Sequence, residues 1–201
     1  MRVRTALKKE EIVSSAAEVF RELGFERASM SEIAARLGGS KATLYGYFDS
    51  KEKLFLAVTH AEAGAYFDPV LHELTTSEQD MPTALRRFGE KTMSYISRPA
   101  AISGRRMILA VAGQSEIGRA FYVTGPKMAL QLIKSYFERA MEHGAVKSGD
   151  AWVMAQHFVA LLESELIPER LYGVKTKIPK ESDIRAAVGR AVDVFMAAYR
   201  V

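Results

Sequence analysis

Apolar residues recur along most of the chain at the spacing of helices that bury one face. Between residues 8 and 23 they follow the i, i+4, i+7, i+8, i+11 rhythm, at Ile12, Ala16, Val19, Phe20 and Leu23. No segment shows the sustained alternation between hairpin turns that is typical of strands. The pattern therefore predicts an all-α protein.

Two short helices are predicted after the first one. Ser29, with a glutamate three residues later, forms the capping-box sequence that opens a helix over residues 30–37. The glycines at 38–39 end that helix, and Ser40 is placed to cap a third helix over residues 40–47. Two short helices joined by a glycine-bearing turn are typical of a helix-turn-helix unit.

Longer helices follow in the rest of the chain. One begins near Lys51, and Pro69 is expected to end or kink it because proline disfavours the helical conformation in the residue before it. Caps and breakers predict further helices over residues 82–96, 126–143, 150–166 and 179–199. The sequence thus predicts a three-helix head with a helix-turn-helix over residues 1–50, and a larger helical body over residues 51–201.

Composition narrows the class of protein. With 201 residues, 48% of them hydrophobic and 26% charged, the chain is typical of globular proteins with a sizeable core. It has no cysteine, which excludes disulfides and thiolate metal sites. Neither a secretory signal nor a membrane-length apolar run is found, so we expect a cytoplasmic protein without a membrane partner. The net charge of +4 is compatible with a polyanionic partner but does not require one.

The helix-turn-helix carries side chains suited to double-stranded DNA. The second helix of such a unit lies in the major groove. There Lys41 can donate to a phosphate or a guanine, and Thr43 offers a hydroxyl and a methyl group. Lys51, with the N–H groups that open the next helix, is expected to form an anion site. The candidate DNA contacts are Ser29, Ser31, Ser40, Lys41, Ala42, Thr43, Tyr45, Tyr47 and Lys51.

Spacing alone leaves a second interpretation open, in which the short helices never touch DNA and the tyrosines only pack. The run IVSSAAEVFRELGFERASMSEIAARLGGSKATLYGYFDSKEKLFLAV resembles the N-terminal domain of TetR-family transcriptional regulators. The motifs F-x-x-x-G-F, S-M-S-E-I-A and L-Y-x-Y-F-x-S-K-E-x-L carry the resemblance, which implies that the second and third helices read DNA. Gly46 departs from the family pattern, where a larger residue is frequent, and glycine weakens a helix interior.

The body is similar to the ligand-binding and dimerisation domain of the same family, in a branch related to the multidrug-efflux regulators. The resemblance implies a homodimer formed by the last two long helices and therefore a palindromic operator. Apolar stripes on these helices are the predicted interface: Met154, Phe158, Leu161, Leu162, Val188, Val192 and Phe195. The alternative is that each stripe covers the core of its own subunit.

A ligand pocket is expected in the body for a small apolar or amphipathic effector, since methionine and aromatic side chains adapt to varied ligands. The candidate lining residues are Leu71, Tyr95, Met107, Val111, Phe121, Met128, Leu132, Trp152 and His157. The alternative for each of them is an ordinary place in the core.

Catalysis is not expected, because the chain has no nucleophile elbow, no P-loop and no dinucleotide-binding glycine motif. The histidines lack metal-ligand spacing, so neither a metal nor a cofactor is predicted. The resulting hypothesis is a repressor that an effector releases from its operator, with the helix from Lys51 as the lever. A ligand-independent DNA-binding or architectural protein, and a helical enzyme or carrier with a vestigial head, are the alternatives.

Overall fold

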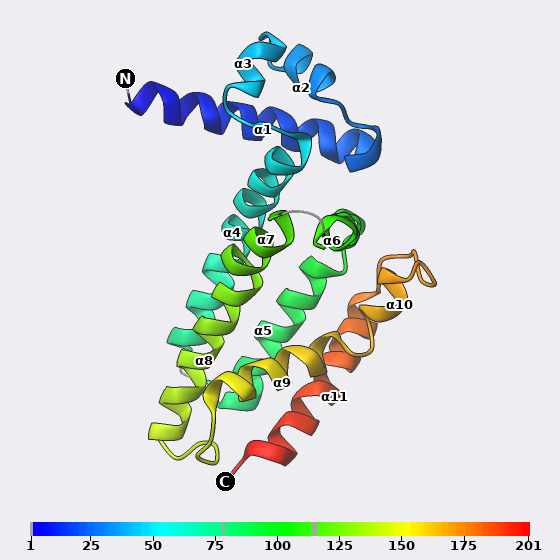
Figure 1. Cartoon of the computed structure of the whole chain (residues 1–201). Helices are drawn as coiled ribbons and strands as arrows, with labels where there is room; N and C mark the ends of the chain where they lie inside the picture. The colour runs from blue at the N-terminus through cyan, green and yellow to red at the C-terminus, as the bar shows by residue number, and fades with distance from the viewer. Residues whose placement is uncertain (1, 78, 114–115) are drawn as a thin grey trace. The chain divides into compact units, whose positions relative to one another are not determined.

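The chain folds into helices joined by turns and loops (Figure 1). The computed structural model describes residues 2–77, 79–113 and 116–201, and these residues form eleven α-helices with one isolated bridge between Val146 and Arg200. The all-α prediction is confirmed. Among these same residues, no helix combines the length and the apolar character that crossing a bilayer requires.

The helices group into two compact units that differ from the predicted domains. The first unit holds residues up to 65 together with 103–121, and the second holds 66–102 and 122–201. The predicted boundary after residue 50 therefore lies inside the first unit. Helix α4 (Lys51–Thr76) contributes to both units, and so does α6 (Pro99–Val111).

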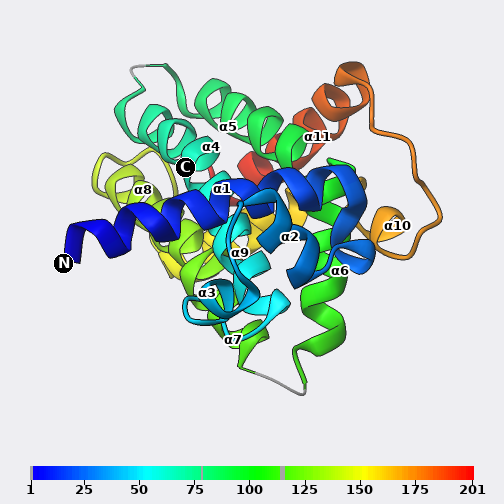
Figure 2. The same ribbon diagram turned by 90° about the horizontal axis from the view of Figure 1, so that it is seen from above.

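The first unit contains the three N-terminal helices of the predicted head. They are α1 (Arg2–Arg27), α2 (Met30–Arg36) and α3 (Lys41–Tyr45). Seen from above, α2 and α3 lie on one flank of α1 (Figure 2). Their inward side chains meet the start of α4 in one apolar core, which includes Ile12, Ala16, Val19, Phe20, Ile33, Leu44, Phe48, Leu54 and Val58.

Part of the body sequence belongs to this first unit. Gly104 of α6 faces Phe55 of α4, and a β-carbon at Gly104 would lie 3.0 Å from Phe55 Cζ. Met107 and Ile108, further along α6, are also buried. The first unit is therefore discontinuous, and it includes most of α6 from the middle of the chain.

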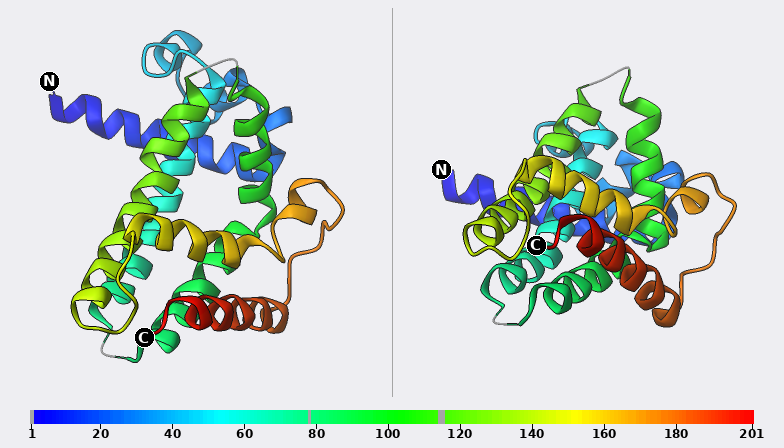
Figure 3. Two further views of the ribbon diagram at one scale, coloured as in Figure 1. Left: turned by 60° about the horizontal axis from the view of Figure 1, so that its bottom comes forward. Right: turned by 90° about the horizontal axis from the view of Figure 1, so that it is seen from below.

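The second unit is a bundle around an aromatic core. Its helices are α5 (Met81–Ile96), α8 (Pro126–Glu142), α9 (Ala151–Glu163), the short α10 (Pro168–Leu171) and α11 (Glu181–Tyr199), while α7 (Ile117–Thr124) spans the division of the units. Helix α11 packs against α5 and α9, and α9 also packs against α8 (Figure 3). Phe137, Phe158 and Phe195 pack ring against ring at the centre, with centroids 5.0 to 6.0 Å apart.

A glycine sets the distance between three of these helices. Gly89 of α5 is buried, and a β-carbon there would lie 2.7 Å from Val188 Cγ1 and 2.8 Å from Leu162 Cδ2. Real β-carbons do not approach side chains this closely, so α5, α9 and α11 meet where α5 has no side chain.

Pro69 was predicted to end or kink the fourth helix. It does not end the helix, because α4 continues to Thr76. Proline removes one N–H, which leaves the carbonyl of Ala65 without its usual helical donor. Ala65 is exposed. Water can therefore satisfy that carbonyl, and the helix can continue past the proline at reduced cost.

Candidate nucleic-acid interface

Helix α2 begins with the capping box that the sequence predicts. The Ser29 N–H donates to Glu32 Oε2 at 2.8 Å, and the Glu32 N–H donates to Ser29 Oγ at 3.2 Å. The Ser29 hydroxyl also donates to the Glu32 carboxylate at 2.8 Å. These bonds fix the start of α2 and occupy the Ser29 hydroxyl within the protein.

Helix α3 is capped in the same way after a tight turn. Gly38 has φ +68°, a conformation that residues with side chains rarely adopt, and it turns the chain between the helices. The Thr43 N–H donates to Ser40 Oγ at 3.1 Å, and the two hydroxyls lie 2.9 Å apart. Together the caps hold a five-residue helix that would not be stable alone.

The outward side of α3 presents most of the predicted contacts. Leu44 is fully buried and anchors the helix, whereas Lys41, Ala42 and Thr43 are exposed and Tyr45 is 49% exposed. Ser31 and Ser40 are exposed as well. Tyr47 is half-buried and packs against the apolar core of the first unit. The structure therefore gathers a polar and aromatic surface at Ser40–Tyr45.

Lys51 does not form the anion site that the sequence suggests. Its ammonium group donates to the carbonyls of Phe25 at 2.8 Å, Ala28 at 3.0 Å and Glu26 at 3.4 Å. It also lies 4.2 Å from the centroid of the Phe25 ring. All three N–H donors are thus used on the C-terminal end of α1 and on Ala28 just after it, so Lys51 ties α4 to the end of α1 and has no donor left for a phosphate.

Ion pairs occupy several other cations of the head. Arg36 donates to both carboxylate oxygens of Glu22 at 2.9 and 2.6 Å, which joins α2 to α1 and lowers the pKa of Glu22. Lys53 pairs with Asp49, and Lys8 pairs with Glu11. These pairs reduce the positive charge that the head presents to an anion.

Two lysines beside α3 stay available. Lys41 is exposed, and no ion-pair partner is described for it in the part of the chain that the structure describes. Lys9 of α1 is exposed and lies 5.6 Å from the centroid of Phe48, just after α3. Sequence reasoning did not single out Lys9, although the basic start of the chain was a signal for it.

Gly46 ends α3 rather than interrupting it. It is the C-cap residue, and a β-carbon there would lie 3.3 Å from the Thr43 carbonyl oxygen. The expected weakening of a helix interior therefore does not apply at this position. The glycine instead allows a tight end between Tyr45 and Tyr47.

The residues predicted for the dimer interface lie mostly in the core of their own unit. Leu161 is half-buried, and the other six side chains are at most 2% exposed, namely Met154, Phe158, Leu162, Val188, Val192 and Phe195. Their stripes face α5 and α8 because α9 and α11 build the centre of the bundle. These six side chains are thus not available to a partner subunit, and the assignment is corrected.

The candidate pocket residues are not brought together within either unit. Met107, Val111 and Phe121 belong to the first unit, whereas Leu71, Tyr95, Met128, Leu132, Trp152 and His157 belong to the second. Among the latter, Leu71 is in the core, and Met128 and Leu132 are exposed on α8. His157 is exposed, and its Nδ1 contacts the Tyr199 hydroxyl.

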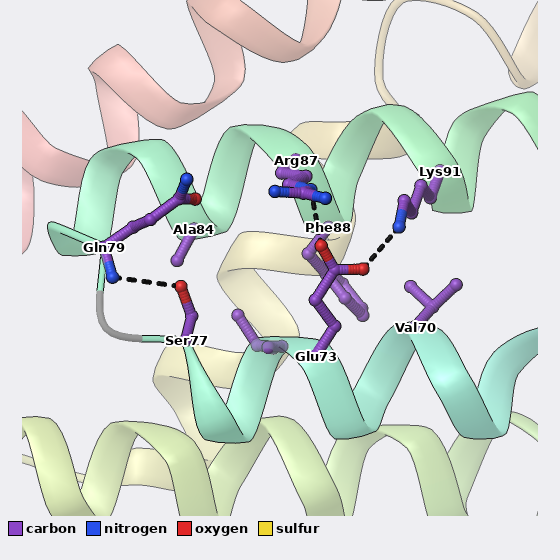
Figure 4. A pocket seen from close by; sticks show the side chains of 9 residues that line it. Val70, Glu73, Ser77, Gln79, Ala84, Arg87, Phe88 and Lys91 are labelled. Atoms are coloured by element: carbon purple, nitrogen blue, oxygen red, sulfur yellow. Dashed lines mark hydrogen bonds and ion pairs between the residues drawn. The ribbon is translucent and has the colours of Figure 1, made fainter.

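The pockets described in the second unit contain none of these residues. One lies between α4 and α5 and has a volume of about 10 Å³, enough for a single water molecule (Figure 4). Glu73 lines this pocket and pairs with Arg87 at 2.5 Å and with Lys91, and the hydrogen bond from Lys91 is the main cause of the lowered pKa of Glu73. The other is an open hollow of about 510 Å³ beside Met81 and Met196.

Metal chemistry has no candidate site here, since the described residues contain no cluster of three or more histidines and carboxylates that could hold an ion. The polar surface around α3 is instead suited to hydrogen bonds with base edges and phosphates. Comparison with known proteins gives information on both units.

Two family profiles together match most of the chain. The profile described as "Bacterial regulatory proteins, tetR family" matches residues 12–58. The profile described as "AefR-like transcriptional repressor, C-terminal domain" matches residues 83–201. The expected likeness to the multidrug-efflux branch stays a prediction, because the C-terminal profile is that of the AefR-like repressors.

Characterised proteins with similar sequences include a transcription regulator and a nucleoid occlusion factor. The HTH-type transcriptional activator FasR of Mycolicibacterium smegmatis is 32% identical over 125 residues, which are 62% of this chain and 52% of FasR. The match thus spans about half of that relative's length. The nucleoid occlusion factor SlmA of Haemophilus influenzae is 24% identical over 155 residues, which are 73% of this chain and 67% of SlmA.

Solved structures match over nearly the whole chain. A regulator from Mesorhizobium loti assigned to the TetR family has a TM-score of 0.86 at 27% identity, and the match covers 98% of this chain and 99% of that one. The flavonoid-responsive regulator FrrA has a TM-score of 0.71 at 27% identity, with 97% and 98% covered. Fold, helix-turn-helix and both profiles agree: the chain belongs to the TetR family of DNA-binding transcription regulators, a family without enzymatic activity.

Proposed function

We propose that the protein is a homodimeric repressor that binds a palindromic operator and leaves it when a small molecule binds. The observation that carries the proposal is the surface of α3, where Lys41, Ala42, Thr43 and Tyr45 are exposed on a helix held by Ser40. Side chains at the N-terminal part of the second helix are the ones that reach base edges in a major groove. Tyr47 and Lys9 are proposed as flanking contacts.

The proposed dimer surface is the outward side of α9 and α11. On α9 this side carries the exposed residues Val153, Gln156, His157 and Ala160, and Ser164 follows as the C-cap of the helix. On α11 it carries Ala186, Arg190, Val194 and Ala197. Small and apolar residues allow two pairs of helices to approach closely. A twofold dimer would present two copies of α3 to successive major grooves.

A small-molecule effector is supported by relationship rather than by a described cavity. FrrA, which shares 27% identity and the whole fold, is named as flavonoid-responsive. An apolar or amphipathic effector would suit the methionines and aromatic residues of the second unit. Such a ligand can release DNA only if it binds the DNA-free state more tightly than the DNA-bound state.

A ligand-independent DNA-binding or architectural protein is the second candidate. The pocket between α4 and α5 favours it, because the Glu73 ion pairs leave room for only about one water molecule. The relative SlmA, named as a nucleoid occlusion factor, favours it as well.

The test is fluorescence anisotropy of the purified protein on DNA from upstream of its own gene, across a salt series, with a scrambled duplex as comparison. Specific binding is expected, with weaker binding for Tyr45→Ala and a salt slope reduced by about one for Lys41→Ala. Lys134→Ala removes a cation of the second unit and is the matched control, with an unchanged slope. Equal and salt-sensitive binding to both duplexes would contradict the proposal.

Two further measurements separate the candidates. A transcriptional reporter under the same DNA shows the sign of regulation; the relative FasR is an activator, so the proposed repression needs this direct check. A screen of apolar and amphipathic compounds, beginning with flavonoids, should find a molecule that lowers the anisotropy of the specific complex. Specific binding that no compound in a broad screen reverses would favour the ligand-independent protein.

A further inference from the structure

The segment between α10 and α11 presents apolar side chains to solvent. Tyr172, Val174 and Ile178 are 87%, 71% and 62% exposed, which places them among the most exposed large apolar residues described. Figures 1 and 3 show this segment, in orange, projecting away from the helices of the second unit. Clustered apolar side chains that the protein's own surface does not cover mark sites of interaction.

The backbone of this segment is held in place by hydrogen bonds. Arg170, which is only 7% exposed, donates to the carbonyl of Leu166 at 2.6 Å and to that of Lys177 at 3.4 Å. The carbonyl of Glu169 accepts from the N–H of Val174 at 2.8 Å. A guanidinium group thus joins the helix before the segment to its far end. Because hydrogen bonds already fix the backbone that carries the apolar side chains, less conformational entropy is lost when they contact a partner.

We infer that residues 172–178 form an arm that docks onto a second copy of this chain. The inference rests on the proposed dimer through α9 and α11. The arm leads directly into α11 at Glu181, and the outward sides of α9 and α11 already expose Val153 and Val194. The arm therefore adjoins the start of one of the two helices that form the proposed interface, whereas Val194 lies thirteen residues further along that helix.

Charges near the arm point to the same occupant. Residues 172–180 include three lysines and no acidic residue. Lys175 pairs with Glu169 at 2.5 Å, whereas no ion pair is described for Lys177 or Glu181 in the described part of the chain. Both are exposed. In a twofold dimer every contact occurs twice, so Lys177 of one arm and Glu181 at the start of the partner's α11 supply complementary charges.

The first test measures self-association of the full chain by sedimentation. Replacing the three apolar residues together (Tyr172→Ser, Val174→Ser, Ile178→Ser) should raise the dissociation constant of the dimer by at least about tenfold. The melting curve of the monomer should not change, because the three side chains make little contact in their own subunit. The control is Leu7→Ser with Leu109→Ser, two residues that are each 60% exposed in the first unit.

The second test uses the absence of native cysteine. A single Val174→Cys variant labelled with an environment-sensitive maleimide dye should show a blue shift that follows the dimer concentration. A Ser148→Cys label, at another exposed position, should show none.

The outcomes separate the arm from the dimer. A wild-type dimer whose dissociation constant is unchanged in the triple variant, with no dye shift, overturns the arm and leaves the dimer intact. A wild-type chain that is monomeric throughout overturns the proposed dimer together with the arm. A dye shift with vesicles of anionic phospholipid, and none on self-association, would assign the arm to a membrane surface and overturn the inference.

Discussion

At the scale of single residues, Lys51 is the side chain whose role the structure changes most. Its ammonium group is surrounded by the carbonyls of Phe25, Glu26 and Ala28 and by the Phe25 ring. Hydrogen bonds from a charged donor are stronger than neutral ones, and their loss leaves carbonyls without a donor. The residue therefore stabilises the joint between α1 and α4 rather than contacting DNA.

Lys51→Met should accordingly lower the free energy of unfolding by about 2 to 4 kcal/mol. The salt slope of DNA binding, measured where the variant is folded, should equal that of the wild type. Urea titration followed by circular dichroism measures the first quantity, and anisotropy measures the second. The control is Lys53→Met, which breaks only an exposed pair with Asp49 and should leave the free energy of unfolding nearly unchanged. If Lys51→Met instead reduced the salt slope and left the stability unchanged, the result would support a contact between Lys51 and a DNA phosphate.

The residue scale also shows what the sequence could and could not predict. The caps at Ser29 and Ser40 are confirmed, because capping depends on residues only three positions apart. The partners of Lys51 are 23 to 26 positions away, so only the folded chain reveals them. Local chemistry was predictable here, and long-range hydrogen bonds were not.

At the scale of helices, α9 and α11 show why an apolar stripe does not identify its partner. The stripe with Phe158, Val192 and Phe195 is apolar as predicted, yet it faces the centre of its own bundle. Periodicity gives the buried side of a helix, but a core and an interface bury the same kinds of side chain. The outward side, with Val153 and Val194, is less apolar, so the periodicity did not select it for the interface that we propose there.

Adjacent residues on α11 give a direct test of this assignment. Val194→Glu places a charge on the proposed dimer surface, so it should produce monomers that keep their melting temperature. Phe195→Glu places a charge among Phe137 and Phe158, so it should unfold the second unit. Light scattering and circular dichroism distinguish these results. A Phe195→Glu protein that is folded and monomeric would place the interface on the inner side after all.

The contact of α5 with α9 and α11 gives a second prediction at this scale. Gly89→Ala should lower the free energy of unfolding by about 1 to 3 kcal/mol, because the added methyl group meets Val188 and Leu162. Gly64→Ala is the matched control on α4, where nothing lies within 4 Å of the added carbon. It should raise the free energy of unfolding by up to about 1 kcal/mol through helix propensity. Urea denaturation of both variants checks the pair, and equal effects would refute the close approach.

At the scale of the whole molecule, the titratable groups predict how stability depends on pH. Burial lowers the pKa of His60 below its usual 6.5, so the unfolded chain binds more protons than the folded chain below that pH. Ion pairs lower the pKa of Glu22, Glu73 and Glu165 below 4.5 in the same sense. Stability should therefore be complete above about pH 6.5, fall through the His60 transition, and fall again below about pH 4.5.

Thermal melts between pH 3 and pH 8 measure this profile. His60→Gln should remove the upper step and leave the lower one, whereas His72→Gln, at an exposed position, should leave both. An upper step that persists in His60→Gln would show that another group causes it.

Because the first unit is built from two separate stretches of sequence, it cannot be exchanged between regulators as one continuous segment. The first unit consists of residues up to 65 and residues 103–121, and Gly104 packs there against Phe55. A chimera that joins only residues up to 65 to a foreign body would separate Phe55 from Gly104 of α6, which packs beside it. Recombination of operator specificity between such proteins is therefore constrained by a segment that lies far along the gene, and a functional graft would need to carry α6 with the head.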